Sequence, residues 1–99
     1  MRGNLRRALA LVRRRTHREV PLPVQLLERE GCELCRETFR ALTRVGLDRA
    51  LLIERIDVGQ EGRYLLRVPL LRVGESELDA AGLDDHAIAR WLNEVEPAG

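Results

Sequence analysis

Two cysteines, Cys32 and Cys35, stand three residues apart at a junction between two kinds of sequence pattern. The run Val24 to Glu28 (VQLLE) before them is typical of a short buried strand, and Gly31 provides a turn point. Helical spacing begins directly after this turn. Two thiols at this spacing can close a small disulfide ring, and the same spacing also supplies half of a zinc site.

The segment that follows the turn reads as a helix of about three turns. Cys35, Phe39 and Leu42 recur at i, i+4 and i+7 on one face, and Gly46 is a favourable C-terminal stop. This periodicity places Cys35 on the apolar stripe, where its sulfur is shielded. It places Cys32 at the tip of the helix, so the two thiols are expected to differ in accessibility.

The rest of the chain predicts an α/β fold. In order, it contains a strand over Leu51 to Val58, an eleven-residue crossover with at most one or two helical turns, a strand over Pro69 to Val73, a Gly74-Glu75 turn of type II′, a strand over Ser76 to Asp79, and a helix from Asp84 or Asp85 to Val95. A parallel pair followed by an antiparallel pair predicts a mixed four-stranded sheet, with helices available for both faces.

Length and composition limit the chain to one small core. Its 99 residues suit a single domain, and Leu, Val and Ile number 29 against three aromatic residues, so the core is mainly aliphatic. The longest apolar run, Ala8 to Val12, is far shorter than the roughly 20 residues of a membrane helix. Two cysteines exclude a secreted scaffold with several disulfides, and we expect a cytoplasmic protein.

The first 18 residues form a basic arm, with seven arginines and no acid, whereas residues 19–99 hold ten arginines against all 16 acids. Apolar spacing predicts a helix from Asn4 to about Arg15, and the prolines that follow break it. We therefore divide the chain into a basic N-terminal extension, residues 1–21, and a domain, residues 22–96. The arm could contact nucleic acid or an anionic surface, but no aromatic residue accompanies its arginines, which favours a solvated extension.

The helix start indicates how the two thiols would react. Unsatisfied N–H groups and the positive end of the helix favour a thiolate at Cys32, which would attack a disulfide, and Cys35 would resolve the resulting mixed disulfide. Glu33 opposes a neighbouring thiolate, and Arg29 or Arg36 could offset its charge.

The strand, the CxxC and helix start, the Val68-Pro69 step and the terminal helix together resemble the glutaredoxin-like branch of the thioredoxin superfamily over about residues 22–96. The resemblance implies a thioredoxin-like fold with a cis bond at Val68-Pro69 beside Cys32, and a Val68 backbone that pairs with the substrate. Arg67 stands where the branch usually has Thr and could hold a glutathione carboxylate. Glu33-Leu34 replaces the usual Pro-Tyr, and Gly74-Glu75-Ser76 replaces the paired glycines and acid.

The resemblance implies an oxidoreductase in thiol-based electron transport, with Cys32 and Cys35 as catalytic residues and Arg67, Val68 and Pro69 as substrate-binding residues. Its partner would be a disulfide-containing protein or glutathione, and glutathione is also a possible reductant, with no bound cofactor or metal. One alternative is a zinc site, which would need His17, His86 or a second copy of the chain. The other is a non-catalytic redox-sensing or interaction module that docks through the basic arm.

Overall fold

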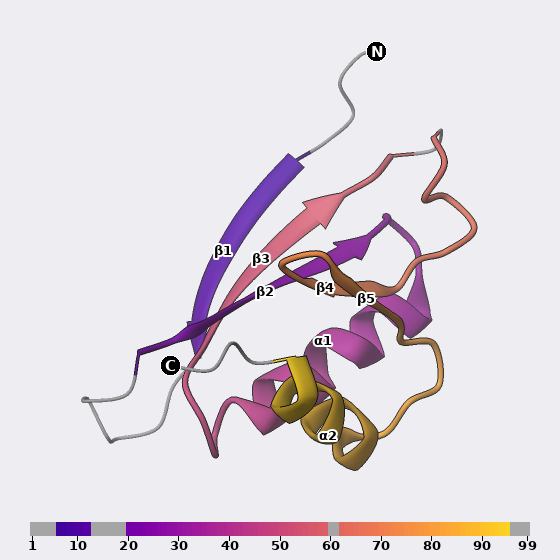
Figure 1. Ribbon diagram of the computed structural model, residues 1–99. Coiled ribbons are helices and arrows are strands. Elements are labelled where there is room, and N and C mark those ends of the chain that lie inside the picture. Colours follow the sequence, from indigo (N-terminus) through magenta and orange to yellow (C-terminus); the bar gives the residue numbers. More distant parts are fainter. Residues whose placement is uncertain (1–5, 13–19, 60–61, 96–99) are drawn as a thin grey trace.

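The computed structural model describes residues 6–12, 20–59 and 62–95 and shows a mixed α/β fold (Figure 1). Its elements in chain order are β1 (Arg6–Val12), β2 (Leu22–Glu28), α1 (Glu33–Val45), β3 (Leu51–Asp57), β4 (Leu70–Val73), β5 (Ser76–Asp79) and α2 (Asp85–Val95). The strand order across the sheet is β1-β3-β2-β4-β5. The central strands β2 and β3 are parallel, and the other neighbouring pairs are antiparallel. The predicted thioredoxin-like architecture is confirmed.

The N-terminal helix predicted from Asn4 to about Arg15 is wrong over residues 6–12, and its remaining residues lie outside the described part of the chain. Within the described residues the sheet has five strands instead of the predicted four. Residues 6–12 form β1, which runs antiparallel along β3 with Ala8 opposite Arg55 and Ala10 opposite Ile53. The run of alternating Ala and Leu in this segment suits a two-faced strand as well as a helix. The N–H and C=O groups along the outer side of β3 favour the strand. A strand beside β3 forms hydrogen bonds with these groups, whereas a helix would not. The division of the chain at residue 21 stays a prediction.

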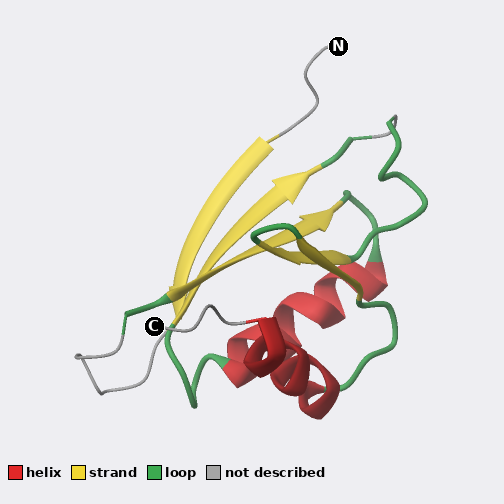
Figure 2. Cartoon of the chain, viewed as in Figure 1, coloured by secondary structure: helices red, strands yellow, loops and turns green. Residues whose placement is uncertain are grey.

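Both helices pack on the same face of the sheet (Figure 2). The larger core cluster lies between the sheet and the helices and joins Leu26 of β2, Ile53 of β3, Leu42 of α1 and Ile88 of α2, each of them fully buried. Because successive strand residues point to opposite faces, this cluster uses the even-numbered residues of β2 and the odd-numbered residues of β3 up to Ile53.

A smaller cluster covers part of the opposite face. Leu27, Ile56, Val58 and Leu70 are buried there, with Tyr64 and Val68 of the β3–β4 connection packed against them. No helix covers this face within the described residues, although the sequence analysis allowed one. The connection is too short for a crossover helix and forms successive turns instead, closed by the Leu65 N–H to the Gly62 carbonyl at 3.2 Å and the Arg67 N–H to the Tyr64 carbonyl at 2.9 Å.

The hairpin of β4 and β5 is as predicted. Gly74, the first turn residue, has φ 59°, and Glu75 has no positive φ, as in a type II′ turn. Leu70 lies opposite Asp79 in this hairpin, so the end of β5 returns to the beginning of β4. The Ala80 N–H donates to the Pro69 carbonyl at 3.0 Å, which fixes β5 beside the Val68-Pro69 step.

Candidate functional site

Cys32 and Cys35 form a disulfide at the beginning of α1, with their Cα atoms 5.2 Å apart. Cys32 is the N-cap residue of the helix, and the backbone N–H of Cys35 donates to its Sγ at 3.1 Å. The carbonyl of Cys32 also accepts the N–H of Arg36 at 3.2 Å, which is the first bond of the helix ladder. The Cys32 sulfur therefore occupies the position in which a helix N-terminus stabilises an anion.

The chain reaches this position through a tight turn at the end of β2. Gly31 has φ 77°, a left-handed conformation that residues with a side chain adopt at a cost, and it redirects the chain from the strand into the helix. The carbonyl of Glu28 accepts the N–H of Val58 at 2.8 Å, so the end of β2 remains joined to the segment that follows β3. The turn and the sheet together fix the position of Cys32 at the C-terminal end of β2.

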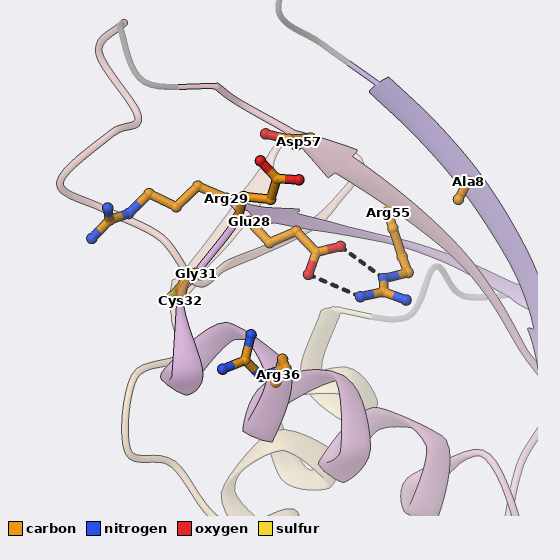
Figure 3. A pocket seen from close by; sticks show the side chains of 9 residues that line it. Ala8, Glu28, Arg29, Gly31, Cys32, Arg36, Arg55 and Asp57 are labelled. Carbon is orange, nitrogen blue, oxygen red and sulfur yellow. Dashed lines mark hydrogen bonds and ion pairs between the residues drawn. The ribbon is translucent and has the colours of Figure 1, made fainter.

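Both cysteines are buried, and Cys32 is slightly the more exposed of the two. Cys35 is 1% exposed within the core, whereas Cys32 is 8% exposed and lines an open pocket of about 460 Å³ (Figure 3). Cys32 is among the residues that line this pocket, and Cys35 is not. The geometry thus gives the pair an outer and an inner sulfur.

The carboxylate next to Cys32 is neutralised by two arginines. Arg36 contacts Glu33 at 2.6 Å and Arg40 contacts it at 3.7 Å. The hydrogen bond and charge of Arg36 lower the pKa of Glu33, with a smaller contribution from Arg40. Of the two arginines that the sequence analysis suggested as compensating charges, Arg36 forms this ion pair. The repulsion expected between Glu33 and a Cys32 thiolate is therefore partly cancelled.

The pocket beside Cys32 also contains charged residues that sequence reasoning missed. The guanidinium of Arg55 donates to both carboxylate oxygens of Glu28, at 2.7 and 3.1 Å (Figure 3). It also stacks on the ring of Phe39, 3.9 Å from the ring centre. The side chain of Arg29 extends away from this pair in Figure 3.

The sequence signal for these residues was their position toward the ends of two strands that were predicted to be parallel, without the register that pairs them. Asp57 lies opposite Glu28 in that register, and its carboxylate accepts the N–H of Gly59 at 2.7 Å. Without the register, nothing in the sequence indicates that Glu28, Arg55 and Asp57 line the same pocket as Cys32.

The Val68-Pro69 bond is cis, as the resemblance implies. Pro69 is buried, and Val68 is partly buried in the smaller core cluster. Leu70 pairs with Leu27. The beginning of β4 therefore lies beside the C-terminal end of β2, where the turn to Cys32 begins. The substrate-binding role of Arg67, Val68 and Pro69 stays a prediction.

Arg67 does not line the pocket beside Cys32. Its guanidinium contacts Glu77 at 3.1 Å and Asp79 at 3.3 Å, both on β5. Arg67, which was predicted to be able to hold a glutathione carboxylate, is therefore bound by two carboxylates of its own chain.

Of the two histidines of the alternative zinc site, the one within the described residues, His86, does not lie beside the cysteines. His86 lines a groove with Arg44 and Asp85 at the C-terminal end of α1, whereas the disulfide lies at its N-terminal end. His17 is outside the described residues.

Comparison with known proteins agrees with this architecture. The family described as Glutaredoxin-like domain (DUF836) matches residues 23–93, and the chain belongs to this family. Searches of curated proteins and of solved structures gave no match. Neither helix in the described part of the chain has the length and apolar character needed to span a membrane.

Proposed function

We propose that the protein is a thiol–disulfide oxidoreductase in which Cys32 is the nucleophile and Cys35 the resolving cysteine. The main support is that an N-capping sulfur lines an open pocket and accepts a helix N–H, with the second sulfur buried behind it. Hydrogen bonds and the helix dipole favour a thiolate at the outer position. The location predicted from the sequence, the cytoplasm, suits a dithiol that cycles between reduced and oxidised forms.

The exchange has two steps. In the first, the Cys32 thiolate attacks one sulfur of a substrate disulfide, a Cys32–substrate bond forms, and the other substrate sulfur leaves as a thiolate that takes up a proton. In the second, Cys35 loses its proton and attacks the Cys32 sulfur, which releases the second substrate thiol and leaves the Cys32–Cys35 disulfide. Two electrons pass from the dithiol to the substrate. An external thiol, glutathione or a dithiol, would return the pair to its reduced state.

Single-cysteine variants test this mechanism. Cys32→Ser should abolish reduction of a model disulfide, because it removes the attacking sulfur. Cys35→Ser should keep the first step and accumulate a mixed disulfide at Cys32, visible by mass spectrometry of the unreduced protein. Full activity of Cys32→Ser, or a trapped substrate on Cys35 in that variant, would contradict the assignment.

A second candidate function is a non-catalytic interaction module that docks through the N-terminal segment. It is favoured by the position of β1 as an edge strand whose Leu9 and Leu11 are 68% and 53% exposed. This candidate predicts partner binding that is unchanged in Cys32→Ser and is lost when the arginines of residues 13–15 are replaced by Glu. Oxidoreductase activity predicts the opposite dependence on Cys32.

A further inference from the structure

We infer that the dithiol acts on disulfides in polypeptides, with an apolar residue near the reacting cysteine, in preference to glutathione disulfides. This inference rests on the proposed oxidoreductase function and names its substrate class. The Val68 backbone does not decide the matter, because an extended protein segment and glutathione both have peptide groups that could pair with it. The decision comes from the charge beside Val68 and from two exposed leucines.

The charge near Val68 disfavours glutathione. Glutathione has two carboxylates and one ammonium group, so it needs a cation for at least one carboxylate. Arg67, the neighbour of Val68, is already bound by Glu77 and Asp79, and this trio has a net negative charge. A glutathione carboxylate at Arg67 would have to displace one of these carboxylates or lie beside both of them. A polypeptide disulfide needs no carboxylate there.

Two exposed leucines lie on the segments that contain the disulfide and lead to the beginning of β4. Leu34, between the two cysteines, is 45% exposed, and Leu66, two residues before Val68, is 92% exposed. One lies in the first turn of α1 and the other in the connection that leads to the beginning of β4. Leu70 at the beginning of β4 pairs with Leu27 near the end of β2. The connection that contains Leu66 therefore leads to the end of β2, from which the turn to the disulfide begins. Apolar side chains of a polypeptide could bury the two exposed leucines, whereas glutathione has no such side chain.

Single-turnover kinetics of the full chain test this substrate class. The protein is reduced with dithiothreitol, freed of it, and mixed with oxidised glutathione or with a peptide cyclised by one disulfide that leucines flank. Formation of the Cys32–Cys35 disulfide is followed by acid quenching and mass spectrometry. We expect a larger second-order rate constant for the peptide, and a smaller one for a matched peptide with serines in place of the leucines.

Two sets of variants separate the two causes. Leu34→Ala with Leu66→Ala should lower the peptide rate constant relative to that of glutathione by roughly three- to tenfold, since less apolar surface is buried. Leu47→Ala is the control, because Leu47 is 67% exposed but follows the far end of α1, and it should leave the ratio unchanged. Glu77→Gln with Asp79→Asn should shift the ratio toward glutathione by roughly two- to fivefold, the range of exposed ion pairs.

The ratio of the two rate constants is measured on one preparation, so an error in the protein concentration does not alter it. Oxidised glutathione that reacts as fast as the leucine peptide, or ratios that neither set of variants changes, would overturn the substrate inference alone. A reduced protein that reacts with neither disulfide would contradict the proposed function itself, and this inference with it.

Discussion

At the scale of single residues, burial and hydrogen bonding give two identical side chains different surroundings. Cys32 accepts a helix N–H and lines a pocket, whereas Cys35 is enclosed by the core. The sequence was enough to predict this difference, because helical periodicity places one sulfur on the apolar stripe and the other at the tip. It could not predict which arginine pairs with Glu33, because that choice depends on side-chain rotamers.

The Glu33–Arg36 ion pair predicts an effect on the thiol. Arg36→Ala should leave the Glu33 carboxylate less neutralised beside Cys32 and should raise the pKa of the Cys32 thiol by roughly half a pH unit or less. Arg40→Ala removes the longer contact and should have a smaller effect. The rate of iodoacetamide alkylation against pH measures both variants. An equal or larger change in Arg40→Ala would show that Arg36 is not the main compensating charge.

At the scale of elements, sequence patterns predicted which segments are regular more reliably than how they pair. The strand before Cys32, both helices and the β4–β5 hairpin follow from periodicity and turn residues. The assignment of residues 6–12 failed, because short runs of Ala and Leu suit either structure and the edge of β3 decides. The parallel register of β2 and β3, which brings Glu28 beside Arg55 on one face, was also beyond local sequence information.

The edge position of β1 predicts lower local stability than that of the central strands. β1 is paired on one side only, and Leu9 is largely exposed, whereas Leu26 of β2 and Ile53 of β3 are fully buried. In native-state hydrogen exchange, the amides of β1 should exchange faster than those of β2 and β3. The central strands are the control within the same sample. Equal protection of β1 and β3 would mean that the strand opens only with the whole molecule.

At the scale of the whole molecule, the sheet has helices on one face and a short connection on part of the other. The sequence predicted the fold class because element order and connection length leave few possible topologies. The sequence left open which faces of the sheet the helices cover. Both lie on one face, and the connection between β3 and β4 is too short to place a helix on the other. A bidentate contact between Arg44 of α1 and Asp85 of α2, at 2.7 and 3.0 Å, helps to hold this helical layer together.

The Arg44–Asp85 contact predicts how stability depends on pH. The hydrogen bond from Arg44 lowers the pKa of Asp85 below its ordinary value of 3.8. The contact therefore stabilises the folded state above that value, and this stabilisation is lost as the pH falls through the lowered pKa. Asp85→Asn should have a lower melting temperature than the unaltered protein at pH 7, and the difference should shrink in acid below pH 3.8. A difference that stays constant over this range would contradict an ionic role for Asp85.

The central claim is that the Cys32 sulfur is held as an activated nucleophile at the beginning of α1. The most direct test is the pKa of Cys32 in the reduced protein, from alkylation rates against pH with the modified residue identified by mass spectrometry. The predicted result is a pKa below the value of about 8.5 for a free cysteine, with Cys32 modified before Cys35. A pKa at or above that value, or earlier modification of Cys35, would contradict the account.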